Sequence, residues 1–150
     1  MSLEIVGIKD PARLLEWRTE VIRAVFGVEP GEVLAEANRR YYATHTSDGS
    51  HRAFMAVADG EDAGCGAICL QSELPSPDNP SGFCAYLMNI YVRPGYRSRG
   101  IGHAIVGRLV DEARRAGCGK IYLETTAEAR TLYSGMGFRE MKGMMKYADI

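Results

Sequence analysis

The sequence predicts one domain of the α+β (mixed α/β) class, with a mostly antiparallel central sheet that contains one parallel strand–helix–strand unit. Short segments of alternating apolar residues, as in half-buried strands, are interspersed with segments in which apolar residues recur at helical spacing. Between residues 83 and 124, a strand pattern, a glycine-rich turn, a helical pattern and another strand pattern follow one another. This is the order of a parallel crossover unit. The expected order of elements is β-α-α-β-β-β-α-β-α-β-β.

Length and composition are those of a small globular protein. The 150 residues suffice for a single domain, and 46% of them are hydrophobic and 25% charged. The formal net charge of −1 argues against electrostatic binding to nucleic acid. No apolar run approaches the ~20 residues that span a bilayer, and the N-terminus lacks a basic and then apolar leader. We therefore expect a cytoplasmic protein with no nucleic-acid or membrane partner.

The cysteines and histidines predict no metal site. Cys65, Cys69, Cys84 and Cys118 form no C-x-x-C pair, and the three histidines lack ligand spacing among them. We expect the cysteines to be buried small hydrophobic residues or free thiols in a reducing compartment.

The first elements are a strand and two helices. Residues Glu4–Ile8 alternate as in a short strand. Asp10-Pro11 is typical of a helix start, and Gly27 supplies the corresponding end. Pro30 begins a second helix, which we expect to end within the turn-forming residues 44–50.

Three strands follow. Arg52–Ala58 and Gly64–Leu70 form the arms of a hairpin through the turn at residues 59–62. Ser72–Gly82 holds three prolines and cannot form regular structure. Phe83–Val92 is the longest strand and is apolar on both faces, which predicts a central place in the sheet.

The C-terminal part begins with the helix after the glycine-rich turn, which Gly117 ends. Ile121–Glu124 is the next strand, and Ala127–Met136 is a short helix. We expect Phe138–Lys142 and Met144–Ala148 to form a last hairpin.

The stretch Asn89–His103 joins the longest strand to the next helix through a basic turn punctuated by glycines. The first N–H groups of a helix have no partner within it and lie at the positive end of its dipole. Glycine lets a backbone approach a ligand closely. The pattern is typical of an anion-binding site, although on these residues alone an ordinary solvent-facing turn is an equally good interpretation.

Two other phosphate-binding motifs fit this turn less well. A Walker-type loop needs a Gly-Lys-Ser/Thr ending, which the chain lacks. A dinucleotide fingerprint is mimicked by Gly100-Ile101-Gly102 and by Glu124 after the next strand. However, its third small position is Ile105, and too little chain follows Glu124 to complete a doubly wound sheet.

Three segments match the pattern of one known family. Arg97–Gly102 fits a Q/R-x-x-G-x-G/A signature, Tyr86–Pro94 fits the strand before it, and Ala129–Phe138 fits an A-x-x-L-Y-x-x-x-G-F segment. Together with the order of elements, they resemble the GNAT superfamily of acyl-CoA-dependent N-acetyltransferases, most strongly over residues 85–138. The resemblance implies a GNAT-like fold and an enzyme that moves an acetyl group from acetyl-CoA to a primary amine of a small molecule or peptide.

The resemblance also implies where acetyl-CoA (coenzyme A) would bind, without a metal ion. Its pyrophosphate would contact the backbone amides of the turn, to which Arg97 and Arg99 add positive charge. Its pantetheine would pair like an extra strand with the preceding strand, where an N–H would polarise the thioester carbonyl. The residues implied in this contact are Ile90, Tyr91, Val92, Arg97, Ser98, Arg99, Gly100, Ile101, Gly102, His103, Thr126, Arg130 and Tyr133.

Tyr133 matches the family's general acid. Direct attack by the amine gives a tetrahedral intermediate that must expel a thiolate, and a thiol of pKa about 8.5 leaves better if it is protonated as it departs. A tyrosine hydroxyl of pKa about 10 is protonated at pH 7 and can donate.

The chain departs from the family pattern at two places. Thr126 stands where many members carry an asparagine that bonds the pantetheine, and Met88-Asn89 stands where many carry a glutamate general base. A lysine-like amine must still lose a proton before it attacks. Glu124 and Glu73 are our candidate bases, and Asp78, a chain of water molecules or an amine that arrives neutral are the alternatives.

The acceptor groove is expected between the first two helices and the Ser72–Gly82 loop, whose carboxylates would suit a cationic amine. Candidate lining residues are Trp17, Arg39, Tyr41, Tyr42, Glu73 and Asp78.

Two further functions stay open. The missing strand carboxylate is compatible with a non-catalytic acyl-CoA-binding or sensing module on the same fold, and a plain interaction module is the third interpretation. Met141, Met144 and Met145 could form an exposed apolar edge that supports a homodimer.

Overall fold

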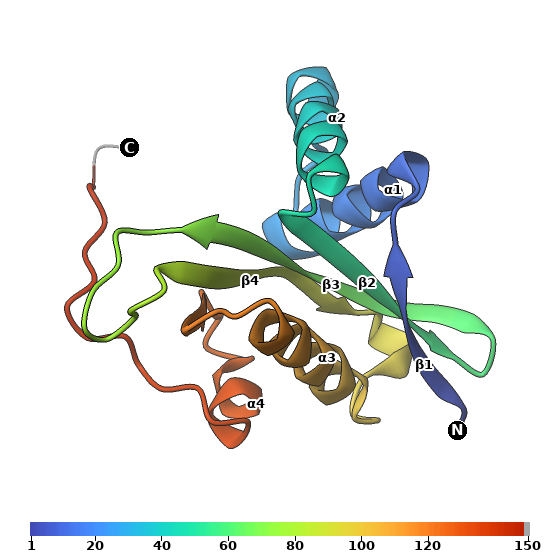
Figure 1. Ribbon diagram of the computed structural model, residues 1–150. Helices are drawn as coiled ribbons and strands as arrows, with labels where there is room; N and C mark the ends of the chain where they lie inside the picture. The colour runs from blue at the N-terminus through green and yellow to red at the C-terminus, as the bar shows by residue number, and fades with distance from the viewer. Residues whose placement is uncertain (149–150) are drawn as a thin grey trace.

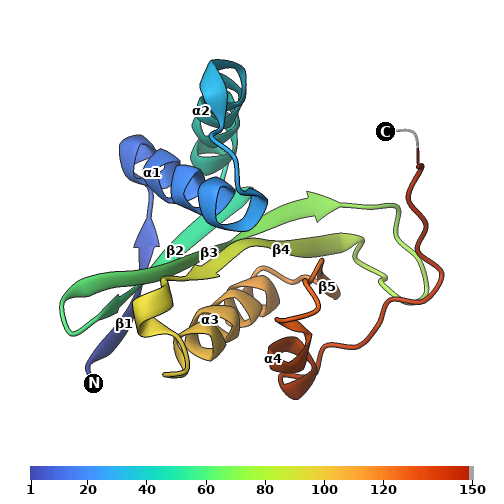
Figure 2. The same cartoon turned by 180° about the vertical axis from the view of Figure 1, so that it is seen from behind.

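The computed structural model describes residues 1–148, which form one five-stranded sheet with helices on both faces (Figures 1 and 2). The strands follow the chain in the order β1-β2-β3-β4-β5. Neighbours from β1 to β4 are antiparallel, whereas β4 and β5 are parallel. The predicted fold class is therefore confirmed, and so is the parallel unit that contains the glycine-rich turn.

The strands are β1 (Leu3–Ile8), β2 (His51–Ala58), β3 (Glu61–Ser72), β4 (Phe83–Val92) and β5 (Lys120–Leu123). The helices are α1 (Pro11–Val21), the π-helical turn η1 (Ile22–Phe26), α2 (Gly31–Ser47), the 3₁₀ turn η2 (Pro94–Tyr96), α3 (Ile101–Arg115) and α4 (Arg130–Gly135). The side chain of Asp10 caps α1 by accepting a hydrogen bond of 3.1 Å from the N–H of Arg13. Gly27, with φ of 69°, follows η1 as the predicted stop.

The main core lies between α3 and the sheet. Ile105 and Leu109 of α3 are fully buried against Ile68 and Leu87 of the sheet. Full burial of such a side chain contributes about 1.5–3 kcal/mol. A smaller core on the opposite face forms where α1 and α2 cover the sheet, as Figure 1 shows. The pocket described below opens on this face, between α1, α2 and the middle of β4.

The predicted C-terminal hairpin is wrong. Residues 138–148 contain no strand, and α4 is shorter than the predicted helix Ala127–Met136. Met144 and Met145 are 60% and 97% exposed, so the apolar residues of the predicted strands Phe138–Lys142 and Met144–Ala148 do not meet a core. A hairpin that covers no other surface is only marginally stable in water.

The four cysteines are free; Cys65 and Cys84 are buried, and Cys69 and Cys118 are half-buried. None of the helices within residues 1–148 has both the length and the apolar character needed to cross a bilayer.

Candidate active site

The candidate site begins where β4 and β5 separate. Pairing between these parallel strands ends at Leu87 and Leu123, and the rest of β4 has no partner on that side within residues 1–148. Asn89 has a φ of 55°, and the pairing with β3 shifts beside it. The shift sets Gly66 opposite both Asn89 and Ile90, which is the arrangement of a β-bulge. A bulge bends its strand, so it accounts for the divergence of β4 from β5.

Two glycines of β3 allow this close packing. A Cβ on Gly64 would lie 2.5 Å from the carbonyl oxygen of Tyr91, and one on Gly66 would lie 2.6 Å from Cγ2 of Ile105. Any larger residue would therefore push β4 or α3 away at the bulge.

The turn between β4 and α3 presents a row of unpaired backbone donors. Within the described chain, no acceptor contacts the N–H groups from Ser98 to His103, and the first helical bond runs from Ala104 to Gly100 at 3.1 Å. Ser98 and Gly100 have φ values of 63° and 80°. Left-handed residues in such a turn direct neighbouring N–H groups to one concave side. Because the N-terminal end of the α3 dipole adds positive potential, this turn can bind an anion such as a phosphate group.

The two arginines of the turn are exposed. Nε of Arg97 donates to the carbonyl oxygen of Val92 at 3.0 Å, and its guanidinium lies 6.0 Å from the Tyr91 ring. The guanidinium of Arg99 lies 5.6 Å from the Tyr96 ring. Both charges thus remain at the surface beside the unpaired N–H groups.

The other residues predicted on this turn differ in role. Ile101 is 1% exposed and Ile90 packs against the same core, so their side chains serve packing. A Cβ on Gly102 would lie 3.4 Å from Leu132, which shows how closely α4 approaches the turn. His103 is exposed in the first turn of α3.

Tyr133 lies on α4 and reaches the separation of β4 and β5. It is 7% exposed and lines the same pocket as residues 88–90. Its ring meets Phe138 edge-on at 5.8 Å. Within residues 1–148 its hydroxyl makes no hydrogen bond, and the hydroxyl is not fully buried. Burial raises the pKa of Tyr133, so the hydroxyl is protonated at neutral pH.

The segment after β5 brings Glu124 and Thr126 to the same pocket. Glu124 is exposed there. The hydroxyl of Thr126 accepts a hydrogen bond of 3.3 Å from the N–H of Ala129 and so supports the start of α4. Arg130 is ion-paired with Glu140 and lines a different cavity, of about 720 Å³, on the far side of β5.

Glu73 is not brought into the site. It follows β3, and its carboxylate pairs with Nζ of Lys120 at 3.1 Å. Neither of the two cavities that Tyr133 lines includes Glu73. The hydrogen bond from Lys120 lowers the pKa of Glu73, with a smaller contribution from Cys84, which makes the carboxylate a weaker base.

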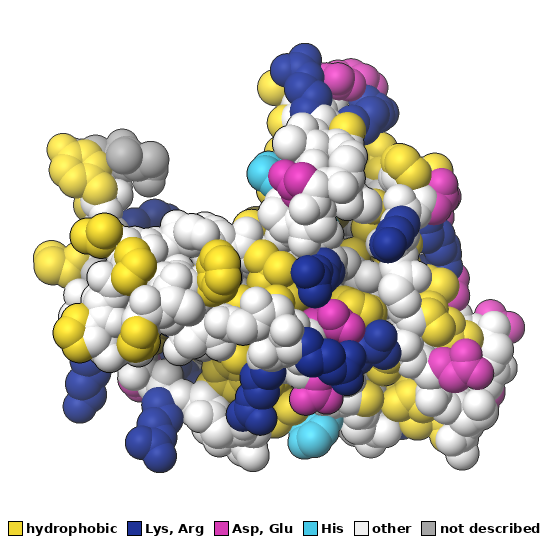
Figure 3. Space-filling view, in the orientation of Figure 1, with side chains coloured by type: hydrophobic (Ala, Val, Ile, Leu, Met, Phe, Trp, Pro, Cys, Tyr) yellow, Lys and Arg dark blue, Asp and Glu magenta, His cyan; other side chains and the backbone are white. Residues whose placement is uncertain are grey.

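A pocket of about 580 Å³ opens on the face covered by α1 and α2. The surface hollow beside α2 is visible in Figure 3. Its walls come from α1, η1 and α2, from the middle of β4 and from the segment after β5. The lining residues are Arg18, Val21, Val25, Phe26, Asn38, Tyr41, Tyr42, His51, Tyr86, Leu87, Met88, Asn89, Ile90, Glu124, Thr125, Thr126, Ala129 and Tyr133.

Tyr41 and Tyr42 of this pocket were predicted from the sequence, whereas polar residues such as Arg18, Asn38 and His51 were not. A signal for Arg18 was available, because it follows Leu14 by four residues and precedes Val21 by three, which sets it on the buried side of α1. His51 and Asn38 carry no such signal.

Three more of the predicted lining residues, Trp17, Arg39 and Asp78, lie outside this pocket. Trp17 is 3% exposed in the core under α1. Arg39 pairs with Glu36 at 3.1 Å on the surface of α2. Asp78 lies in the exposed loop after β3, bound by the hydroxyl of Ser76 at 2.5 Å.

Aromatic side chains and a neutral histidine form one wall of the pocket. Nδ1 of His51 lies 2.9 Å from the Tyr41 hydroxyl, and its ring meets Tyr42 edge-on at 5.3 Å. Burial, with smaller contributions from His45 and Arg18, lowers the pKa of His51 to about 4. His51 is therefore uncharged at pH 7. Burial also raises the pKa of Tyr42 to about 12.

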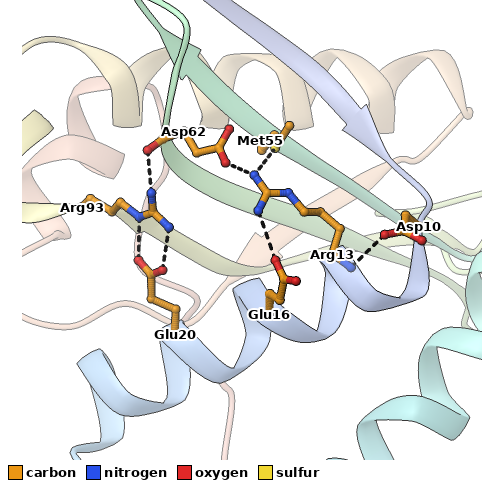
Figure 4. A network of polar contacts seen from close by, with 7 residues as sticks. All are labelled: Asp10, Arg13, Glu16, Glu20, Met55, Asp62 and Arg93. Atoms are coloured by element: carbon orange, nitrogen blue, oxygen red, sulfur yellow. Dashed lines mark hydrogen bonds and ion pairs between the residues drawn. The ribbon is translucent and has the colours of Figure 1, made fainter.

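An ionic network fixes α1 against the sheet beside the pocket (Figure 4). Arg93 binds both carboxylate oxygens of Glu20, at 2.8 and 2.9 Å, and the carbonyl oxygen of Asp62 at 2.9 Å. Its guanidinium also lies 4.7 Å from the Trp17 ring. Arg13 pairs with Asp62 as well. Bidentate pairs of this kind hold their partners in one geometry.

Comparison with known proteins connects these features. Residues 13–138 match the model of the acetyltransferase (GNAT) family. The chain is 40% identical over 65 residues to N-alpha-acetyltransferase 30 of Saccharomyces cerevisiae. This match covers 41% of this chain and 37% of that protein. It is 32% identical over 95 residues to thialysine N-epsilon-acetyltransferase of Sus scrofa, covering 49% and 56%. The matched part thus spans between about a third and somewhat more than half of these relatives.

The fold has close counterparts as well. The crystal structure of a predicted acetyltransferase from Clostridium acetobutylicum with acetyl-CoA superimposes with a TM-score of 0.86 at 22% identity, over 97% of this chain and 96% of that one. The match to the family model extends over most of the chain and includes the bulged strand, the glycine-rich turn and Tyr133. The resemblance read from the sequence is confirmed, and the chain belongs to the GNAT family of acetyltransferases.

Proposed function

We propose that this protein is an N-acetyltransferase, which transfers the acetyl group of acetyl-CoA to a primary amine of a small molecule or peptide by direct attack. One observation carries the proposal: the turn with the unpaired N–H groups of Ser98 to His103 directly follows the unpaired part of β4, and Tyr133 lines one pocket together with residues 88–90 of that strand. The same pocket is lined by residues of α1 and α2.

The donor side fits acetyl-CoA. The turn between β4 and α3 offers its N–H groups to the pyrophosphate, with Arg97 and Arg99 as exposed counter-charges. The backbone of Ile90, Tyr91 and Val92 follows the point where β4 loses its partner strand, so it can pair with an extended chain such as pantetheine. The carbonyl oxygen of Val92 accepts a hydrogen bond from Arg97. An N–H of this backbone would then stabilise charge on the thioester oxygen.

Tyr133 is proposed as the general acid. Its hydroxyl has no partner within residues 1–148, and its raised pKa keeps the proton in place at neutral pH. It can therefore donate to the sulfur of coenzyme A as the carbon–sulfur bond breaks, so that coenzyme A leaves as a thiol. Thr126 and Arg130 are weaker candidates for donor contacts, because one supports α4 and the other is paired with Glu140.

Glu124 is the general base that we retain. It lines the pocket together with Tyr133, whereas Glu73 is paired with Lys120 outside the pocket. A carboxylate beside the pocket attracts an ammonium group and can take its proton, directly or through water.

Thiol release from acetyl-CoA tests the proposal. Wild-type protein should release coenzyme A only when a suitable amine is present, and mass spectrometry should detect the acetylated amine. The amines should include a free amino acid and a peptide N-terminus, because the two curated relatives are named for an ε-amino and an α-amino group. If acetyl-CoA binds but no amine causes release of coenzyme A, the alternative is favoured, which is a non-catalytic acyl-CoA-binding or sensing module. The absence of a carboxylate at Met88-Asn89 is compatible with that alternative.

A further inference from the structure

Arg18 is the arginine among the residues that line the pocket of about 580 Å³, which we call the acceptor pocket. It lies on α1 between the buried residues Leu14 and Val21, and it is only partly exposed. Most arginines of this protein point to solvent or pair with acids. An arginine on the buried side of a helix, with its charged end in a pocket, is unusual unless its charge is paired.

The guanidinium of Arg18 has no acidic partner among residues 1–148. Its one hydrogen bond runs from Nη1 to Oδ1 of Asn89, at 2.8 Å, and Asn89 is neutral. The neighbouring Arg13 and Arg93 pair with Asp62 and Glu20. Arg18 therefore keeps most of its five N–H donors available, and a partly buried positive charge without a counter-ion is unfavourable. A negatively charged ligand would remove this cost.

The position of Arg18 is fixed by its surroundings. The bond to Asn89 ties it to the β4 bulge, where the thioester is proposed to lie. The Arg93–Glu20 pair and the Trp17 contact hold the same turn of α1 on the sheet, as Figure 4 shows for Glu20 and Arg93. Such rigid support is typical of a residue that orients a ligand.

The pocket carries opposite charges on different walls. Arg18 comes from α1, whereas Glu124 comes from the segment after β5. Burial raises the pKa of Tyr86, and the nearby Glu124 carboxylate adds to this effect. Between them lie mostly apolar and aromatic side chains together with the uncharged His51. This distribution suits a molecule with a positive amine and a negative group.

We propose that the acceptor is an amine that also carries an anionic group, a carboxylate or a phosphate, which Arg18 binds while the amine faces the β4 bulge. Arg18 is thus the residue that determines acceptor specificity. Guanidinium groups bind both kinds of anion through paired N–H donors. This inference rests on the proposed acetyltransferase function and adds the class of its acceptor.

Matched pairs of amines test the inference. L-lysine and L-lysinamide differ in the carboxylate, and glucosamine 6-phosphate and glucosamine differ in the phosphate. For wild-type protein, kcat/KM from thiol release should be at least about tenfold higher for the anionic member of one pair, as expected for a charged hydrogen bond. The pair that shows this difference in kcat/KM identifies the anionic group that Arg18 binds as a carboxylate or as a phosphate.

Variants of two arginines, Arg18 on α1 and Arg23 on the η1 turn that follows it, distinguish a role in binding the acceptor from a structural role. Arg18→Gln should reduce the ratio within the responding pair to about twofold or less, mainly by raising KM of the anionic member, and should leave KM for acetyl-CoA unchanged. Arg23→Gln is the matched control, because Arg23 is exposed, pairs with Glu29 and lies outside the pocket; it should retain the wild-type ratio. Equal rates for both members of each pair, or an equal loss for both in Arg18→Gln, would overturn the inference.

A separate outcome identifies failure of the proposed function. If no amine causes thiol release, the protein is not acting as an acetyltransferase on these compounds. Calorimetric titration of the same pairs into the protein saturated with coenzyme A then decides the role of Arg18. Tighter binding of an anionic member that is lost in Arg18→Gln supports the site, and binding that is equal for both members or independent of Arg18 contradicts it.

Discussion

Tyr133 is the side chain on which the proposed chemistry depends most. Tyr133→Phe keeps the packing against Phe138 but removes the proton donor. We expect kcat to fall at least about tenfold, since general acids contribute about 10²–10⁴-fold, while the Kd of acetyl-CoA stays nearly constant. Steady-state thiol release and calorimetry check the two parts.

The control for this change is Tyr147→Phe, because Tyr147 is 70% exposed and lines neither of the two cavities described above. It should leave kcat at the wild-type value. An unchanged kcat in Tyr133→Phe would show that Tyr133 is not the general acid.

His51 gives a prediction about pH. Its pKa in the folded protein is about 4, whereas an unfolded histidine has a pKa near 6.5. Below a pH of about 6.5 the unfolded state therefore binds more protons than the folded state. The free energy of unfolding should decrease as the pH is lowered from about 6.5 to about 4. From pH 7 to pH 5 the free energy of unfolding should decrease by about 2 kcal/mol through this residue.

Urea unfolding at the two pH values measures this loss in the wild type, in His51→Gln and in His103→Gln. The loss should shrink by the same amount in His51→Gln, and the variant of the exposed His103 should behave like the wild type. The same pH dependence in all three proteins would show that His51 is not the buried neutral group described above.

At the residue scale, the proposed donor side rests on local sequence patterns, whereas the proposed acceptor side does not. The turn from Arg97 to Gly102 and the segment around Tyr133 are local patterns, and each keeps its meaning without the rest of the chain. The pocket instead combines Arg18, His51 and Glu124, which are far apart in the sequence. Only the pairing of strands and the seating of α1 bring them together.

At the scale of elements, the β4 bulge depends on the glycines of the neighbouring β3. Gly64→Ala would set a Cβ 2.5 Å from a backbone oxygen of β4. Overpacking of this kind costs about 1–3 kcal/mol, so the free energy of unfolding in urea should drop by that amount. Acetyl-CoA binding should weaken as well, because β4 moves.

The matched control is Gly107→Ala in α3, where an added Cβ meets no atom within 4 Å. Since alanine favours a helix over glycine by about 0.5–1 kcal/mol, this variant should be as stable as the wild type or more stable. Equal stability of both variants would mean that Gly64 does not control the approach of β4.

Boundaries of buried elements were predicted well because periodicity reports burial. β4 is indeed interior to the sheet, and α3 begins and ends within two residues of its glycine signals. The C-terminal hairpin failed for the same reason: alternation near Met141 and Met145 imitates a strand, but no core is there to receive it. The bulge at Asn89 could not be seen, since it results from pairing with Gly66.

At the scale of the whole molecule, the sheet separates two tasks. In the proposed reaction the α3 side and the turn before it bind the donor, and the α1 and α2 side forms the acceptor pocket (Figures 1 and 2). The divergence of β4 and β5 connects them. The homodimer stays a prediction; Met141, Met144 and Met145, which would form its apolar edge, are 39%, 60% and 97% exposed.

The central claim is that coenzyme A binds along the diverging part of β4 and the turn before α3. Titration of coenzyme A into ¹⁵N-labelled protein, followed by amide NMR shifts, tests it most directly. The largest shifts should belong to the N–H groups of Ser98 to His103 and of Met88 to Val92, because these donors lack partners or lie beside the strand separation. Shifts confined to the cavity behind β5, around Arg114, Arg139 and Met141, with the turn unaffected, would contradict the account.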